Sequence, residues 1–126
     1  MRDALLIFGS MSLATKDTAV YSADTLDLNL PAKQFTGREN NVCVVFQPSA
    51  DFAATDGMIP FIQDSANGTD FTTILTGAEV TAPTEKSQIV LPIPVSHKRY
   101  LRAGATPKSS GTFTAVAATA WIELGK

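Results

Sequence analysis

The sequence predicts an all-β fold, a sandwich or barrel of about eight strands. Short runs rich in Val, Ile, Thr and Phe recur at fairly even spacing, and clusters of Gly, Pro, Asn and Asp separate them. The chain has 126 residues, of which 44% are hydrophobic, and this is enough for a core that needs no disulfide or metal. We therefore expect a single domain over residues 1–126, with Pro31–Asn41 and Ala78–Lys86 as loops within it.

Strands are expected wherever β-branched and aromatic residues gather between turn residues. In chain order they lie at Leu5–Gly9, Thr25–Asn29, Val42–Gln47, Met58–Gln63, Phe71–Thr76, Gln88–Ile93, Arg99–Ala105 and Thr112–Leu124. A further short strand is predicted at Thr18–Tyr21. Asn67 and Gly68 tolerate a positive φ and predict a tight hairpin turn, and Ser109-Ser110-Gly111 predicts a similar connection before the last strand.

Two of these segments carry additional information. The run Thr112–Leu124 has small or apolar residues on both faces of an extended strand, which favours a central strand covered on both sides. A helix is the competing prediction, because the run is rich in alanine. Pro92 and Pro94 flank Ile93 and cannot donate hydrogen bonds to a ladder, so this stretch must leave the sheet or lie at its edge.

Charge and cysteine content argue against several classes of protein. Ten basic and twelve acidic residues give a net charge of −2, so no strong field attracts nucleic acid or an anionic membrane surface. No apolar run is long enough to span a bilayer.

The single Cys43 cannot close a disulfide within the chain, which suggests a reducing compartment. Met1–Phe8 could belong to a short signal peptide, but the acidic Asp3 and the apolar Ala4–Phe8 favour a buried strand instead.

A search for catalytic groups finds little. The one histidine, His97, lies in a polar loop next to a proline break, where histidine is usually exposed to solvent. A nucleophilic pair of Cys43 and His97 is conceivable, but Cys43 lies within an apolar strand, where cysteine usually acts as a small core residue. No glycine-rich phosphate loop is present. We expect no catalytic residue and no cofactor.

Two further patterns are candidate binding sites. The segment Asp64–Asp70 resembles a calcium loop superficially, but Ala66 and Gly68 occupy positions where oxygen ligands are needed, so we expect a plain turn and no metal. Arg99 and Arg102 fall on opposite faces of a strand and cannot form one basic stripe, so a structural ion pair or a protein contact is expected for at least one of them. Aromatic residues that could stack on a sugar are as easily placed in the core: Phe52, Phe71 and Phe113.

Five segments, in order along the chain, match a known pattern. They are Ser22–Leu28, Phe61–Ser65, Leu91–Pro94, Arg99–Arg102 and Gly111–Ala115. In these segments the chain resembles the small capsid cement, or decoration, proteins of short-tailed bacteriophages, of the Bordetella phage cement protein type. The most specific parts are the Arg-Tyr-Leu-Arg and Gly-Thr-Phe-Thr-Ala motifs. Two departures are Val116-Ala117, where the family pattern has a glycine, and the proline-containing stretch Ala78–Lys86.

The resemblance implies a jelly-roll β-sandwich without enzymatic activity. It further implies binding, as a dimer, to the major capsid protein on the outside of an HK97-type shell, so that neighbouring capsomers are tied together. The protein would be made in the bacterial cytoplasm and reside on the virion surface, with no nucleic acid or membrane partner. Residues 1–8 would form either an arm on the capsid or an ordinary first strand. Candidates for capsid or dimer contacts are Arg2, Leu5, Phe8, Arg99 and Arg102.

Two other classes of function fit the same composition. A carbohydrate-binding β-sandwich module would need a planar row of exposed aromatic side chains. A small secreted enzyme or enzyme inhibitor would need Met1–Phe8 to act as a signal peptide.

Overall fold

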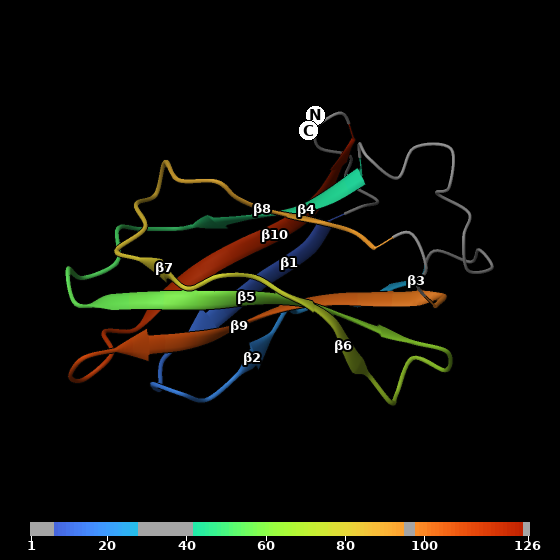
Figure 1. Ribbon diagram of the computed structural model, residues 1–126, viewed down its shortest axis with the longest axis horizontal. Coiled ribbons are helices and arrows are strands. Elements are labelled where there is room, and N and C mark those ends of the chain that lie inside the picture. Colours follow the sequence, from blue (N-terminus) through green and yellow to red (C-terminus); the bar gives the residue numbers. More distant parts are fainter. Residues whose placement is uncertain (1–6, 28–41, 95–97, 125–126) are drawn as a thin grey trace.

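Two antiparallel sheets pack face to face in the computed structural model, which describes residues 7–27, 42–94 and 98–124 (Figure 1). No helix occurs in this part of the chain, so neither the alanine-rich helix nor a membrane-spanning helix is found among these residues. The ten strands are β1 (Ile7–Leu13), β2 (Val20–Tyr21), β3 (Leu26–Asp27), β4 (Val42–Pro48), β5 (Asp56–Ser65), β6 (Thr72–Thr76), β7 (Val80–Thr81), β8 (Ile89–Pro92), β9 (Tyr100–Ser109) and β10 (Val116–Leu124).

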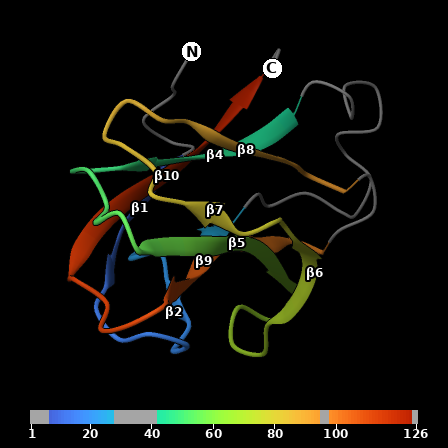
Figure 2. The ribbon, with the colours of Figure 1, turned by 60° about the vertical axis from the view of Figure 1, so that its left-hand side comes forward.

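The strand order is that of a jelly roll. Sheet A has the order β1-β10-β4-β8, and sheet B has the order β2-β9-β5-β6, with β3 beside β9 and β7 beside β5. When the two-residue strands β3 and β7 are set aside, eight strands remain, and consecutive strands alternate between the sheets except at the β5–β6 hairpin, in the order of two Greek keys. Figure 2 shows the two layers from a second direction. The predicted all-β jelly-roll sandwich of about eight strands is therefore confirmed.

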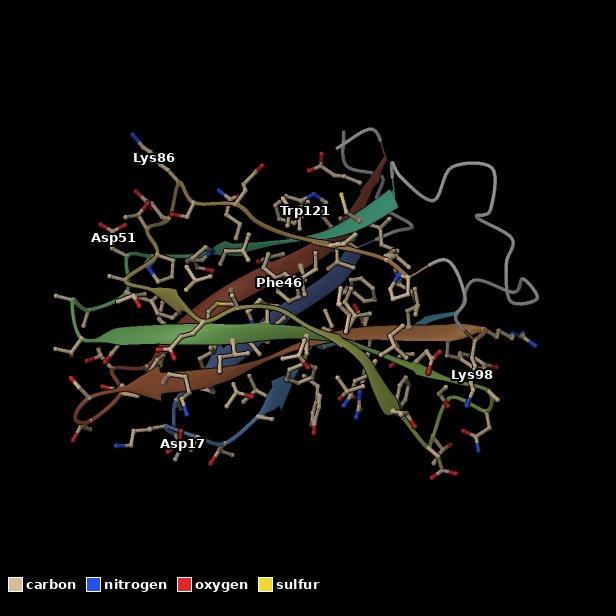
Figure 3. All side chains as sticks on the ribbon, in the orientation of Figure 1. Asp17, Phe46, Asp51, Lys86, Lys98 and Trp121 are labelled. Carbon is tan, nitrogen blue, oxygen red and sulfur yellow. The ribbon has the colours of Figure 1, made fainter. Side chains whose placement is uncertain are left out.

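The core lies between the sheets and is built from alternate residues of each strand. Figure 3 shows Phe46 of β4 between the two layers, while Trp121 of β10 lies on the opposite side of sheet A. Each large side chain removed from water contributes roughly 1.5–3 kcal/mol to folding. The most completely buried core side chains are Phe8, Leu13, Val44, Phe46, Met58, Ile62, Leu101 and Ile122.

The last strand is central, as predicted, because β10 pairs with both β1 and β4. Ala118 and Ala120 are fully buried on its core face, and Trp121 is 3% exposed on the other face. The strand begins at Val116 rather than at Thr112. Phe113 instead turns into the core at the end of the sandwich, where its ring meets Phe52 edge to face at 5.8 Å between centroids.

Proline residues occur inside two central strands of sheet B, which the sequence rules disfavour. In a β-strand the N and the carbonyl O of one residue point to the same side. The carbonyl of Pro107 accepts from Asp17 N, beyond the end of β2, and the carbonyl of Pro60 accepts from Gly77 N, just past β6. Each proline nitrogen thus faces a side on which the neighbouring strand has already ended. Pro92, by contrast, lies on the edge strand β8, as predicted.

Several predicted boundaries are corrected. Strand β1 continues past Gly9, where a bulge with φ of 92° shifts the register, because Ser10 and Ser12 alternate with buried residues instead of ending the strand. The hairpin turn is confirmed at Gly68, with φ of 79°. The connection after Ser109 is not a hairpin, because β9 belongs to sheet B and β10 to sheet A. The expected loop Ala78–Lys86 contains the short strand β7.

Candidate functional site

The outer face of sheet B carries an organised group of aromatic and polar side chains. Leu101 and Ala103 of β9 point into the core, so Arg102 between them points outward. In register with it, Gln63 of β5 also faces outward. We call this group the Arg102 cluster, and its members are Tyr21, Phe61, Gln63, Phe71, Thr73 and Arg102.

The guanidinium group of Arg102 lies between two aromatic rings. Its Cζ is 3.9 Å from the ring centroid of Tyr21 and 4.1 Å from that of Phe71, distances at which cation–π attraction is significant. Its Nε donates to Oε1 of Gln63 at 2.6 Å, and Nε2 of Gln63 donates in turn to Oγ1 of Thr73 at 3.0 Å. These contacts hold the guanidinium plane in one orientation.

A glycine makes room for the aromatic support of this cluster. Phe61 of β5 is paired with Gly104 of β9, and a Cβ at position 104 would overlap the Phe61 ring. The ring of Phe61 meets Tyr21 in an edge arrangement, with centroids 5.9 Å apart and an interplanar angle of 72°. Tyr21 is itself 43% exposed. The cluster is thus built on the backbone of β9 and opens to solvent at Tyr21.

In the polar turn between β5 and β6, side-chain oxygen atoms accept hydrogen bonds from backbone N–H groups of the turn itself. Oδ1 of Asn67 accepts hydrogen bonds from the backbone N–H groups of Thr69 and Asp70, at 2.9 Å each. Oγ of Ser65 accepts from the backbone of Gly68 at 2.9 Å. The predicted turn is therefore confirmed. Across residues 7–27, 42–94 and 98–124, no three His, Cys, Asp or Glu side chains are grouped closely enough to hold a metal ion.

A buried carboxylate fastens the loop between β9 and β10. Asp56, 1% exposed, accepts hydrogen bonds from Oγ of Ser109 at 2.7 Å and from the backbone N–H of Thr114 at 2.8 Å. These two donors, with a weaker contribution from Thr55, hold the pKa of Asp56 below its ordinary value of 3.8. Asp56 therefore contributes to folding in its charged form, and its place at a sheet end gives it a structural role.

The outer face of sheet A carries a second buried group. Nε1 of Trp121 donates to Oε2 of Glu123 at 2.6 Å, and the thiol of Cys43 donates to the carbonyl oxygen of Glu123 at 3.7 Å. Beside it is a hollow of about 240 Å³, lined by Gln47, Pro48, Ser49, Thr119 and Trp121.

Surface ion pairing is found at the far end of sheet B. Nζ of Lys108 and Oδ1 of Asp17 lie 2.6 Å apart, and this hydrogen bond lowers the pKa of Asp17 and raises that of Lys108. Asp17 has a positive φ of 65°, a conformation that aspartate tolerates better than most residues. Both side chains are partly exposed, so the pair adds little to stability.

The residues singled out in the sequence fall in different places. Arg102 is the centre of the outer cluster, while the guanidinium of Arg99 lies 5.2 Å from the ring centroid of Tyr100. Phe8 is fully buried in the core, so its side chain serves the fold and presents no surface to a partner. Arg2, Leu5 and His97 lie outside the described residues.

Cys43 corrects one detail of the sequence interpretation. It is 4% exposed, so its burial was predicted correctly. Alternation along β4 places Val44 and Phe46 in the core, however, so Cys43 faces the outer side of sheet A.

The aromatic residues considered for sugar stacking form no exposed row, because Phe52 and Phe113 are buried together and Phe71 is half-buried beneath Arg102.

Sequence reasoning missed most partners of Arg102. Tyr21, Gln63 and Phe71 come from three separate parts of the chain, and only the strand order of sheet B brings them together. One local signal was present: Tyr100 and Arg102 alternate with the apolar Leu101 and Ala103, which is typical of an outward face.

Comparison with known proteins places the chain in a family. No curated protein matches it. A family model described as Bbp16 matches residues 10–122, which extend from β1 to β10 and include the whole Arg102 cluster. The chain belongs to the Bbp16 family. Bbp16 is a family of Bordetella phage proteins, in agreement with the resemblance seen in the sequence, and the match indicates a structural phage protein associated with the virion.

Proposed function

We propose that this Bbp16 family member is a non-enzymatic capsid cement protein. It binds the outside of an HK97-type shell through the major capsid protein and ties adjacent capsomers together. The observation that carries the proposal is the family match over residues 10–122, which covers both sheets of the jelly roll. A small sandwich with a single packed core is rigid, and rigidity lets one molecule hold two neighbouring subunits at a fixed separation.

Stabilisation by such a protein follows from mass action. A ligand that binds the assembled shell and not its dissociated parts shifts the equilibrium toward the shell. When one copy touches two capsomers, the second contact becomes effectively intramolecular and raises the apparent affinity by about 10² or more. Many copies of a weak contact are then sufficient, and no reaction is required.

The proposal includes a dimer of the chain on the capsid surface. A twofold dimer presents the same surface twice and so suits a role between two equivalent capsomers. Sedimentation of the purified protein at micromolar concentration should give twice the 13.4 kDa of one chain. A monomer under these conditions removes the dimer and leaves the cement function in place.

Particle stability tests the proposal. Phage particles that lack the protein should release their DNA at a lower temperature, or under milder osmotic stress or chelation, than complete particles. Adding the purified protein back should restore the resistance. Particles that are equally robust with and without the protein would show that it does not stabilise the shell.

A further inference from the structure

Among the residues that the structure describes, Arg102 is a positive charge held in place without an acidic partner. Its guanidinium contacts the rings of Tyr21 and Phe71 and donates from Nε to Gln63. Among the residues that the structure describes, no other hydrogen bond or ion pair of Arg102 occurs, so its terminal Nη groups have no acceptor within this part of the chain. The side chain is half-buried, which reduces its contact with water.

The geometry determines from which side a ligand can approach. The rings of Tyr21 and Phe71 pack against the guanidinium, and one of its edges is occupied by Gln63. The remaining edge carries the Nη donors, whose planar arrangement matches the two oxygen atoms of a carboxylate. Because Arg102 is already fixed, it loses little conformational freedom when it binds, so more of the interaction energy remains for affinity.

We propose that Arg102 binds an acidic side chain of the major capsid protein and anchors the docked molecule there. The inference rests on the proposed cement function and names the contact chemistry within it. A protein partner is favoured over nucleic acid because one fixed arginine in a chain of net charge −2 provides no track for a phosphate backbone. Arginine and tyrosine in a partly desolvated surface group are also the residue types that dominate protein interfaces.

The cluster supplies both an apolar surface and an oriented charge for such an anchor. The 43% exposed Tyr21 offers apolar ring surface for a partner to cover. Covering it removes water from Arg102 and strengthens the ion pair. Gln63 accepts from Nε of Arg102 and donates to Thr73, and these hydrogen bonds keep the arginine oriented.

Binding of purified variants to shells that lack the protein tests the inference. Arg102→Gln removes the charge, and Arg102→Lys keeps the charge but loses the planar pair of donors. Lys86→Gln is the matched control, because Lys86, labelled in Figure 3, is exposed, lies in the loop between β7 and β8 and is not a member of the Arg102 cluster. We expect both Arg102 variants to raise the dissociation constant about tenfold or more, and the control to bind as the wild type does. Circular dichroism and thermal unfolding verify that each variant is folded.

A second experiment uses the wild-type protein and therefore does not depend on how the variants fold. Shell carboxylates are converted to neutral amides with a carbodiimide and an amine, and wild-type protein is then added. Binding should fall by about the same factor as for Arg102→Gln, and Arg102→Gln itself should lose little more on treated shells.

Each outcome decides one question. Equal binding of wild type, Arg102 variants and control overturns the Arg102 inference and leaves the cement function standing, as does unchanged wild-type binding to amidated shells. If Arg102 variants lose self-association rather than shell binding, the occupant is a second copy of the chain and the inference is wrong. Failure of the wild type to bind untreated shells contradicts the proposed function itself.

Discussion

Phe61 of β5 lies directly against the backbone of Gly104 in the neighbouring strand β9. A Cβ at position 104 would overlap Cε1 and Cζ of the ring and would lie 2.7 Å from the carbonyl oxygen of Val20. The absence of a side chain at this one position therefore lets the Phe61 ring approach the β9 backbone and support Tyr21, which in turn packs on Arg102.

Replacing this glycine should be costly. Gly104→Ala forces the ring or the β2 backbone to move, and overpacking of this kind typically costs about 1–3 kcal/mol of the free energy of unfolding. The matched control is Gly111→Ala, because a Cβ there meets nothing within 4 Å. Chemical denaturation of the two variants measures the difference, and equal stabilities would show that the packing at Gly104 is not tight.

Acid should destabilise the protein through Asp56. Hydrogen bonds from Ser109 and Thr114 hold the pKa of the folded carboxyl below 3.8, so its contribution to stability is present above that pH. The contribution is lost as the pH falls through the lowered pKa of the folded state. Asp56→Asn should therefore be less stable at neutral pH and should lose less stability than the wild type on acidification.

Denaturant unfolding between about pH 5 and pH 1 measures this dependence. Glu79→Gln, at an exposed carboxylate, serves as the control and should keep the wild-type dependence. If Asp56→Asn and the wild type lose stability in parallel over this range, the Asp56 hydrogen bonds are not the source of the acid sensitivity.

Cys43 should be protected in the native protein. The thiol is 4% exposed and is hydrogen bonded to the carbonyl of Glu123, so a thiol reagent should label it slowly until the protein is denatured. Cys43→Asp should lower the free energy of unfolding by about 3 kcal/mol or more, because it buries an uncompensated charge. Cys43→Ala is the milder control. Rapid labelling of the folded protein would place the thiol at the surface.

The sequence predicted the sandwich because local runs of apolar, β-branched and aromatic residues mark most of its strands. Val42–Pro48 is a nearly continuous apolar run, and its strand was placed within one residue. Strand β5 begins earlier than predicted, at Asp56, because a hydrogen-bonded carboxylate can be buried where isolated propensity disfavours it. The predicted strand Arg99–Ala105 ends before Pro107, whereas β9 continues to Ser109, because the end of β2 makes a proline tolerable there.

The surface cluster could be predicted only in part. Arg102 was identified as a contact candidate from its place in the strand. Tyr21 and Phe71, which cover it, are 81 and 31 positions away along the chain. Pairings of this kind depend on the order of strands in sheet B, and local patterns of polarity do not encode that order.

Cosedimentation with assembled shells tests the central claim most directly. Purified protein is mixed either with mature shells that lack it or with free subunits of the major capsid protein, and each mixture is separated by centrifugation. Only the assembled lattice presents two capsomers at the right separation, so the protein should sediment with shells, saturate at a fixed ratio, and remain unbound to free subunits. If it does not sediment with shells, or binds free subunits equally well, the cement account is wrong.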